Sequence, residues 1–516
     1  MFPSYKQFAR WSELFQAVPI WIEPELPASD MLGWAHNLAG QESEFFFLHS
    51  ASTGPQARYS YIALDHPRYT IGAQGGSLTV RYHAAGGTRH EALKIGNPLD
   101  RFEDWFGQFQ GPPVDALPPF WGGAVGYFAY DSARYFDPAL GRTFGARRNR
   151  PGLPATEKFN EFEFGIFDAV AVVDHALRRL WLVHTVLLPA GKSLSPVQLE
   201  KIYRGAQDRL RRYAVEFQKA AYRRKTWGAF RAAEIRSNRS EAAYRLMIRR
   251  AKGYIGSGDI YQCNLSQSFS STWEGDPWSL YRRLIRINPS PYSALWRSGS
   301  RWIVSASPEL LMRQQADWVE TRPIAGTYPR PPDASDDAAI LATLRNDAKE
   351  RAEHIMLVDL ERNDLGRVCR PGSVHVAESL ITEIYSHVIH LVSDIRGQLT
   401  PGGKWKDVLR ACFPGGTITG CPKIRCMELI ERLEAQRRGP YCGSLGWIGY
   451  AGNTTFNILI RSIFLDKGHL SFPTGAGIVA DSDPLNEYHE TLHKARALQL
   501  ALQDETPMKP ARRKSP

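Results

Sequence analysis

The stretch RWIVSASPELLMRQQADWVETRPIAG, residues 301–326, places strand-like runs one after another with only turns between them. Similar β-rich runs alternate with turns from residue 45 to about 185, which predicts an antiparallel-rich layer. Residues 240–259 instead show the apolar spacing of a helix. Strands and helices that lack a regular strand–helix–strand alternation predict an α+β fold, in which helices sandwich the sheets.

Composition limits the class of protein. The chain has 516 residues, of which 43% are hydrophobic and 23% are charged, as expected for a soluble protein with two domains or one large domain. Its six cysteines lack the spacing of a zinc site or of a disulfide framework. No apolar run reaches the roughly 18 residues that a membrane span needs. We therefore expect a cytoplasmic protein with reduced thiols.

The formal net charge of +11 raises the question of nucleic-acid binding. Much of the positive excess lies in residues 204–236 and in the C-terminal stretch KPARRKSP. Neither segment interleaves basic and aromatic residues as a nucleic-acid platform does. A basic nucleic-acid-binding protein therefore stays only as the non-enzyme alternative, and acidic small molecules or an acidic protein are the expected partners.

Changes in composition divide the chain into four parts. We expect an N-terminal region at residues 1–190, a polar and basic linker at 191–236, a second region at 237–502 and a disordered tail at 503–516. No internal repeat is visible, so the two large regions are not copies of each other.

The turn TRPIAGTYPR, residues 321–330, has the composition of an anion-binding loop. Arg322 and Arg330 flank the pair Gly326 and Thr327, and small residues let backbone N–H groups approach a ligand. Ala325, at the centre, offers only a methyl group. The alternative interpretation is an ordinary turn.

Two expected helices carry pairs of glutamates. Glu350 and Glu353 lie on a helix expected over about 335–358, and Glu487 and Glu490 lie on the last helix, whose same face Lys494 continues. If the two faces oppose each other, their oxygens suit Mg²⁺, which takes one or two protein carboxylates and leaves other positions to substrate oxygens. The alternative is two solvated faces.

Two Gly-rich segments are expected to form turns that bind an anion. FPGGTITGCPK, residues 413–423, leads into a helix whose N-terminus offers free N–H donors. FPTGAGIVADSDP, residues 472–484, offers a second turn with Gly475 and Gly477, and Arg461 can grip a carboxylate. Taken alone, His390 is a half-buried strand histidine and Glu309 a surface carboxylate at a strand end.

The order of these motifs resembles one enzyme family. YQCNLSQ, SASPELL, TRPIAGTYPR, AEHIMLVDLERNDLGRV, HVIHLVS, FPGGTITGCPK, YCGSLGW, GAGIVADSDP and EYHETLHKA follow each other between residues 261 and 495. This series is similar to the chorismate-utilising enzymes, specifically the synthase subunits of aminodeoxychorismate synthase and anthranilate synthase. The resemblance covers 237–502 as a chorismate-binding catalytic domain and extends into 1–190. It implies two intertwined subdomains, with antiparallel-rich sheets that form a sandwich flanked by helices.

The resemblance also implies roles for single residues. Glu309 matches the general acid that protonates the departing C4 hydroxyl, and His390 and Thr417 match residues that line the reacting ring. Glu353 and Glu490 match ligands of Mg²⁺, supported by Glu350 and Glu487. The residues matched to substrate binding are Tyr441, Arg461, Gly475, Gly477 and Lys494, with Ala325, Gly326 and Thr327 in the pocket wall.

Several positions bear on the choice between family members. Gln262 stands where the water-activating family members carry Lys, which argues against water as the nucleophile. Four local signatures favour aminodeoxychorismate synthase: Asn264 in YQCNL, FPGG in place of FPAG, YCGS, and His49 in FLHS in place of the Glu of a feedback motif. Ser50 beside His49 is the candidate tryptophan-site residue. Ala325 favours anthranilate synthase, because aminodeoxychorismate synthases typically carry a nucleophilic Lys there.

We therefore expect Mg²⁺-dependent amination of chorismate to 4-amino-4-deoxychorismate for para-aminobenzoate and folate synthesis. Formation of anthranilate and pyruvate is the alternative. No segment resembles a glutamine amidotransferase, so a separate amidotransferase subunit is the expected partner and source of ammonia.

Overall fold

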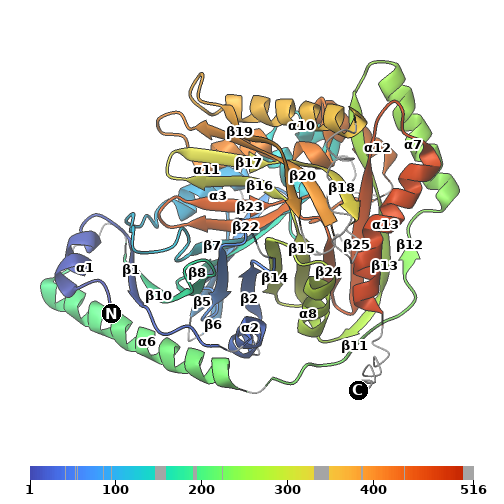
Figure 1. The fold of residues 1–516 in the computed structure, drawn as a ribbon. Coiled ribbons are helices and arrows are strands. Elements are labelled where there is room, and N and C mark those ends of the chain that lie inside the picture. The colour runs from blue at the N-terminus through green and yellow to red at the C-terminus, as the bar shows by residue number, and fades with distance from the viewer. Residues whose placement is uncertain are drawn as a thin grey trace, which may run out of the picture.

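The computed structural model describes residues 1–28, 30–40, 42–52, 54, 56–84, 87–93, 96–145, 159–189, 194–223, 225–329, 348–384, 388–434 and 436–503. Its described strands form two large antiparallel sheets, and helices pack around them (Figure 1). The expected α+β class is confirmed.

The first sheet joins strands from both ends of the chain. Its N-terminal strands and its later strands meet where β2 pairs with β14. Along the sheet, the order is β1 (Ala17–Ile22), β10 (Arg179–Leu187), β9 (Ala169–Asp174), β3 (Tyr59–Ala63), β2 (Glu44–His49), β14 (Tyr292–Ser298), β15 (Arg301–Ser307), β24 (Ser462–Asp466), β25 (His469–Ile478), β13 (Gln262–Gly275) and β11 (Phe230–Ala232), with β12 (Arg236–Ser237) and β21 (Gly420–Cys421) also paired with β13.

The second sheet is built in the same way, and its two halves meet where β22 pairs with β7. The order is β18 (Ile324–Pro329), β20 (Val388–Gln398), β17 (Trp318–Arg322), β16 (Leu310–Gln315), β23 (Thr454–Asn457), β22 (Ser444–Gly449), β7 (Gly123–Phe128), β8 (Phe162–Phe167), β4 (Tyr69–Gln74), β5 (Ser77–Ala84) and β6 (Gly87–Leu93), with β19 (His375–Ile384) paired with β20. Because each half of the chain supplies part of both sheets, the two halves are intertwined.

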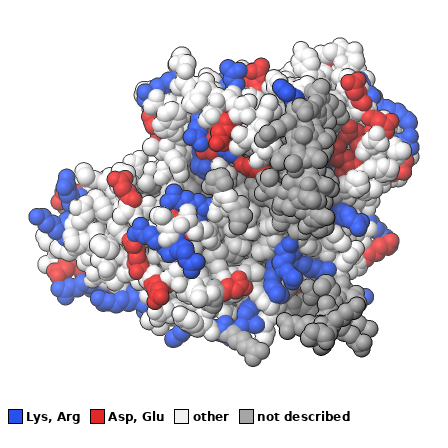
Figure 2. Space-filling view, in the orientation of Figure 1, with Lys and Arg blue, Asp and Glu red and all other residues white. Residues whose placement is uncertain are grey.

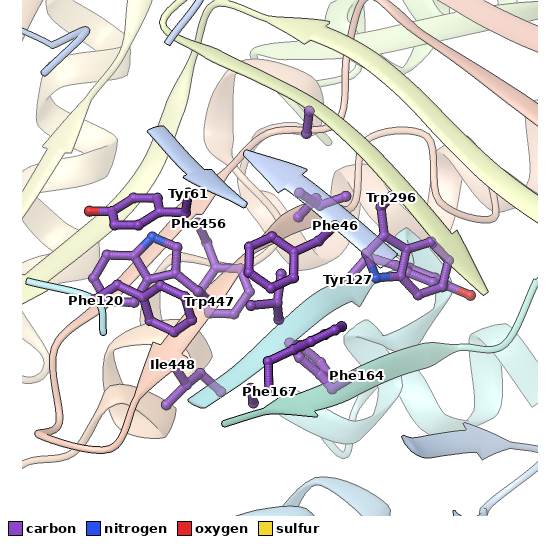
Figure 3. Packing of buried hydrophobic residues seen from close by; sticks show 14 of the residues in the cluster. Phe46, Tyr61, Phe120, Tyr127, Phe164, Phe167, Trp296, Trp447, Ile448 and Phe456 are labelled. Atoms are coloured by element: carbon purple, nitrogen blue, oxygen red, sulfur yellow. The ribbon is translucent and has the colours of Figure 1, made fainter. Parts of the chain in front are cut away.

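Aromatic side chains fill the space between the sheets (Figure 3). The ring of Phe46 in β2 lies 4.6 Å from that of Phe167 in β8, and the ring of Trp296 in β14 lies 5.1 Å from that of Tyr127 in β7. Both pairs meet edge to face, which suits the charge distribution of aromatic rings. The apolar face of each sheet is therefore buried against the other.

Helices cover the outer faces (Figure 1). The described helices are α1 (Tyr5–Ser12), α2 (Met31–Ala39), α3 (Pro98–Phe106), α4 (Ala133–Phe136), α5 (Leu140–Gly145), α6 (Pro196–Tyr222), α7 (Glu241–Gly256), α8 (Pro277–Ile287), α10 (Ala348–Gly366), α11 (Trp405–Cys412), α12 (Lys423–Leu433) and α13 (Pro484–Leu502), with the 3₁₀ turns η1 (Tyr130–Ser132) and η5 (Gly416–Ile418). The last helix, α13, packs on β25, α7 and α8. It begins where the Asp483 carboxylate accepts hydrogen bonds from the N–H groups of Leu485 and Asn486.

The helix expected over about 335–358 extends beyond its predicted end. Its described part, α10, continues to Gly366, because the sequence after 358 contains neither Pro nor Gly before that residue. Residues 335–347 lie outside the described part of the chain. The segment expected as a basic linker, 191–236, contains α6, which packs against α2 and β10. Beyond Gln503 the expected tail is also outside the described part.

Two further observations concern the membrane and the thiols. Across the ranges given above, no helix combines the length and the apolar character that crossing a bilayer requires. All six cysteines are free thiols, and all but Cys421 are buried.

Candidate active site

Glu309 lies in the short connection between β15 and β16 and is only 4% exposed. Its Oε1 accepts a long hydrogen bond of 3.5 Å from the Ile324 N–H. Burial raises the pKa of the Glu309 carboxyl to about 7, while the Thr417 hydroxyl, that N–H and the Lys494 ammonium act against the rise. The carboxyl expected at the surface is therefore buried and can hold a proton near neutral pH.

Several residues expected to bind substrate come together beside Glu309. The Lys494 ammonium donates to the Gly475 carbonyl over 3.1 Å, and the Arg461 guanidinium lies 3.4 Å from the Lys494 carbonyl. Tyr441 is buried beside Gly475, since its hydroxyl stands 3.1 Å from where a Cβ on Gly475 would lie. The structure thus collects two cations and a phenol around one end of β25.

Arg461 has an unusual backbone. Its φ of 51° lies in the left-handed region, which non-glycine residues seldom adopt. Burial lowers the pKa of its guanidinium below the ordinary value, although Tyr441 and Glu490 act in the opposite direction. Backbone strain and a partly desolvated charge at one residue are typical of a functional position.

His390 lies on β20 opposite Thr327 of β18. It lines a small cavity together with Arg461 and with Pro308, the residue before Glu309. Burial and the neighbouring Arg461 charge lower the pKa of His390 to about 3. The imidazole is therefore neutral at physiological pH and can act only as a neutral donor or acceptor toward a ligand.

The second Gly-rich turn was predicted wrongly, because Gly475 and Gly477 lie within strand β25. They pair with Ser266 and Asn264 of β13. A Cβ on Gly475 would stand 2.5 Å from Asn264 Oδ1, and a Cβ on Gly477 would stand 2.9 Å from Gln262 Nε2. The glycines are needed for close approach between a strand and the polar side chains of its neighbour, not for a turn.

We expect Gly475→Ala to lower the stability by about 1–3 kcal/mol and to weaken chorismate binding, because the new methyl group also lies 2.9 Å from the Leu265 carbonyl. Urea unfolding and the KM for chorismate measure the two effects. Gly205→Ala on α6 is the matched control, since an added Cβ there meets nothing within 4 Å. If both variants behaved alike, the close approach at Gly475 would have no energetic importance.

The prediction of an anion-binding loop at 321–330 is also wrong. Residues Ile324–Pro329 form β18, with a register shift at Gly326 between Ala325 and Thr327. Arg322 is 5% exposed and pairs with Glu383 at 2.7 Å and Asp394 at 2.9 Å, so it is not available to a ligand. Arg330, and the side chains of Ala325, Gly326 and Thr327, lie outside the described part.

The four glutamates expected around Mg²⁺ lie on α10 and α13. Glu353 and Glu490 are partly exposed, and Glu490 pairs with Lys494 at 2.5 Å. Glu487 is buried and accepts a hydrogen bond of 2.7 Å from the Ser482 hydroxyl. The side chain of Glu350 is not described. Within the described ranges no group of three or more acidic, His or Cys residues converges, but two carboxylates suffice for Mg²⁺ that also binds substrate oxygens.

Ser50, the candidate tryptophan-site residue, lines a cavity of about 280 Å³ whose walls come from strands of both sheets. Its hydroxyl donates to the Tyr59 carbonyl over 2.8 Å. His49 lines the same cavity, and burial lowers its pKa to about 3. Among the described lining residues there are arginines, Arg58 and Arg313, but no Asp or Glu. The cavity therefore has no described carboxylate to bind an ammonium group.

Sequence reasoning missed two buried ionisable groups, Arg438 and Glu361. The Arg438 guanidinium pairs with Glu434 at 2.7 Å and donates to the Asn264 and Ile418 carbonyls, which ties β13 to η5. Glu361 is buried on α10. The signals were present as RRGPYCGS and DLERND, but nothing in the local pattern distinguishes a buried charge from a solvated one.

Comparisons with known proteins agree with this arrangement. The family model of chorismate binding enzymes matches residues 45–500. Aminodeoxychorismate synthase component 1 of Bacillus subtilis is 39% identical over 467 residues, which covers 90% of this chain and 93% of that protein. Anthranilate synthase component 1 of Streptomyces coelicolor is 41% identical over 472 residues, covering 90% and 85%.

Solved structures give the same result. The crystal structure of anthranilate synthase component I from Streptococcus pneumoniae superposes with a TM-score of 0.69 at 30% identity, covering 86% of this chain and 93% of that one. The menaquinone-specific isochorismate synthase of Escherichia coli superposes with a TM-score of 0.65 at 18% identity, covering 97% and 99%, which shows a shared fold. The chain belongs to the family of chorismate binding enzymes.

Proposed function

We propose that this protein aminates chorismate with ammonia to 4-amino-4-deoxychorismate, in the cytoplasm and for para-aminobenzoate and folate synthesis. The observation that carries the proposal over anthranilate formation is His49. A neutral histidine occupies the position where anthranilate synthases usually carry the Glu of their feedback motif, and the cavity beside Ser50 has no described carboxylate. A chain without that feedback device suits folate synthesis better than tryptophan synthesis.

In the proposed reaction the Glu309 proton passes to the C4 hydroxyl oxygen, which leaves as water. The ammonia nitrogen forms a bond to the ring and then loses one proton, so atoms and charge balance. Arg461, Lys494 and Tyr441 would hold the carboxylates of the substrate, and His390 and Thr417 would line the ring. Charged and dipolar groups fixed in advance are the main source of rate enhancement that such a site offers.

We further propose that Glu353 and Glu490 hold Mg²⁺, with Glu350 and Glu487 behind them. When bound, the metal would supply positive charge to a substrate carboxylate. For Glu490 to bind the metal, its ion pair with Lys494 would have to break.

We expect Glu490→Gln to weaken Mg²⁺ binding by at least about tenfold, as measured by calorimetry without chorismate. Equal affinity in the variant and the parent chain would contradict this assignment.

The central experiment incubates the purified chain with chorismate, Mg²⁺ and an ammonium salt. We expect an aminated product that keeps its enolpyruvyl group. Fluorescent anthranilate with an equal amount of pyruvate would establish the alternative function, which Ala325 favours.

Glutamine should serve as the nitrogen source in place of the ammonium salt only when a glutamine amidotransferase subunit is added. Glutamine hydrolysis by the chain alone would contradict the proposed partner.

Ala325 also predicts that no covalent intermediate forms, because a methyl group has no lone pair. We expect Ala325→Lys to gain an adduct of chorismate less one water, since the new amine can attack the ring and expel the hydroxyl. Intact-protein mass spectrometry detects the adduct. An adduct on another lysine of the parent chain would contradict direct attack by ammonia.

A further inference from the structure

A groove of about 530 Å³ lies between α8 and the segment that leads into β11. Arg282, Arg283 and Arg286 line it from α8, and Trp227 and Phe230 line it from the other segment. Among its described lining residues there is no Asp or Glu. Lys and Arg side chains gather in the lower right of Figure 2, at the place where Figure 1 draws α8. The groove is therefore a concentration of positive charge to which the proposed reaction assigns no role.

The three arginines of the groove lack the carboxylate partners that neutralise other arginines of this chain. No described Asp or Glu forms an ion pair with any of them, whereas Arg245 on α7 pairs with Glu241 at 2.9 Å. Arg283 instead donates to the carbonyl of Gln503, just after α13. These contacts fix Arg283 without balancing its charge, so the groove attracts negatively charged groups.

Trp227 holds cations in the groove. The Lys225 ammonium lies 5.1 Å from the centre of its ring and the Arg282 guanidinium lies 5.0 Å from it, and the His36 ring contacts it edge to face. The negative face of an aromatic ring attracts cations. Because the ring already carries two cations, it offers little surface on which a nucleic-acid base could stack. The groove therefore suits carboxylates better than flat rings.

The groove lies beside the candidate active site. Residues 288–291, which directly follow α8, line the small cavity shared by His390 and Arg461. The helix α8 also packs on α13, which carries Lys494. A protein that binds in the groove would therefore lie next to the reaction site without entering it.

We propose that the groove docks an acidic segment of the glutamine amidotransferase subunit, which places the source of ammonia beside the active site. The inference rests on the proposed function, because that function requires ammonia from a separate subunit. Arginine binds carboxylates through two parallel hydrogen bonds, and arginine and tryptophan are enriched among the residues that dominate protein interfaces. The 13 residues after Gln503 carry four basic and two acidic side chains, so that segment of this chain has the wrong charge for the groove.

The test is the affinity of the amidotransferase subunit for the full chain, measured by calorimetry in the double variant Arg282→Gln with Arg286→Gln. We expect the Kd to rise at least about tenfold, because the charges that face the acidic segment are gone. Glutamine-dependent chorismate consumption at limiting subunit should fall with it, while ammonium-dependent consumption stays unchanged. Binding as tight as that of the parent chain would overturn the proposal.

Two further variants make the result specific. Arg249→Gln with Arg250→Gln is the matched control, because it removes the same charge from an exposed face of α7. Its Kd should equal that of the parent chain, and an equal weakening would show that only net charge matters. Arg286→Glu alone disturbs no described polar contact, so it should weaken binding in a chain that unfolds at the same urea concentration as the parent.

The remaining outcomes separate the groove from the proposed function. If the parent chain consumes no chorismate with an ammonium salt but the double variant loses the subunit, the proposed function fails and the docking surface stands. If the parent chain consumes chorismate but does not bind the subunit, the docking surface fails and the amination stands. An oligothymidine that binds the parent chain and not the double variant, while the subunit binds both equally, would assign the groove to nucleic acid and overturn the proposal.

Discussion

Replacing Glu309 with Gln should lower kcat for ammonia-dependent chorismate consumption by about 10²–10⁴-fold. Gln has nearly the shape of Glu but no proton to donate to the departing hydroxyl. Stopped or steady-state assays of chorismate loss measure the effect. Glu241→Gln on α7, where the side chain is 45% exposed and pairs with Arg245, is the control and should keep full activity.

The same substitution separates catalysis from stability. Burial raises the folded-state pKa of Glu309 above the value of an unfolded chain, so the stability that its neutral form provides is lost as pH rises toward and through about 7. Glu309→Gln cannot ionise and should therefore be at least as stable as the parent chain above that pH. A variant that unfolds more easily at alkaline pH would show that the loss of activity comes from misfolding.

Arg438→Met should cost about 3–5 kcal/mol of unfolding free energy, because it leaves the Glu434 carboxylate buried without its cation. Arg438 is 2% exposed as a side chain, donates to the Asn264 carbonyl at 2.7 Å, and lies 4.7 Å from the centre of the Tyr130 ring. Urea unfolding followed by fluorescence measures the change.

Two comparisons make the Arg438 result specific. Arg432→Met, on the exposed face of α12, should change stability by less than about 0.5 kcal/mol. Adding Glu434→Leu to Arg438→Met should recover part of the loss, because the unpaired buried charge is removed. If the single and double variants lost the same stability, the cost would come from packing and not from an unpaired charge.

Much of the fold could be predicted because its signals are local. Strand alternation, the helix start at Asp483 and the order of motifs all depend on residues close together in the chain. Segments that look alike locally were assigned less well. GAGI has the glycine content of a turn but forms part of β25. Its glycines are needed because the side chains of Asn264 and Gln262 leave no room for a Cβ at these positions. Arg322 has the chemistry of an anion ligand, but carboxylates from other strands already neutralise it.

The sequence by itself determined the α+β class and the family, because motif order and residue type record them directly. Only the tertiary structure decided which charges are buried and what each one faces. Arg438 meets the Asn264 carbonyl across 174 residues of chain, and Thr321 meets Glu361 across 40. Proton affinity depends on burial and on nearby charge, and both arise only when distant segments pack together.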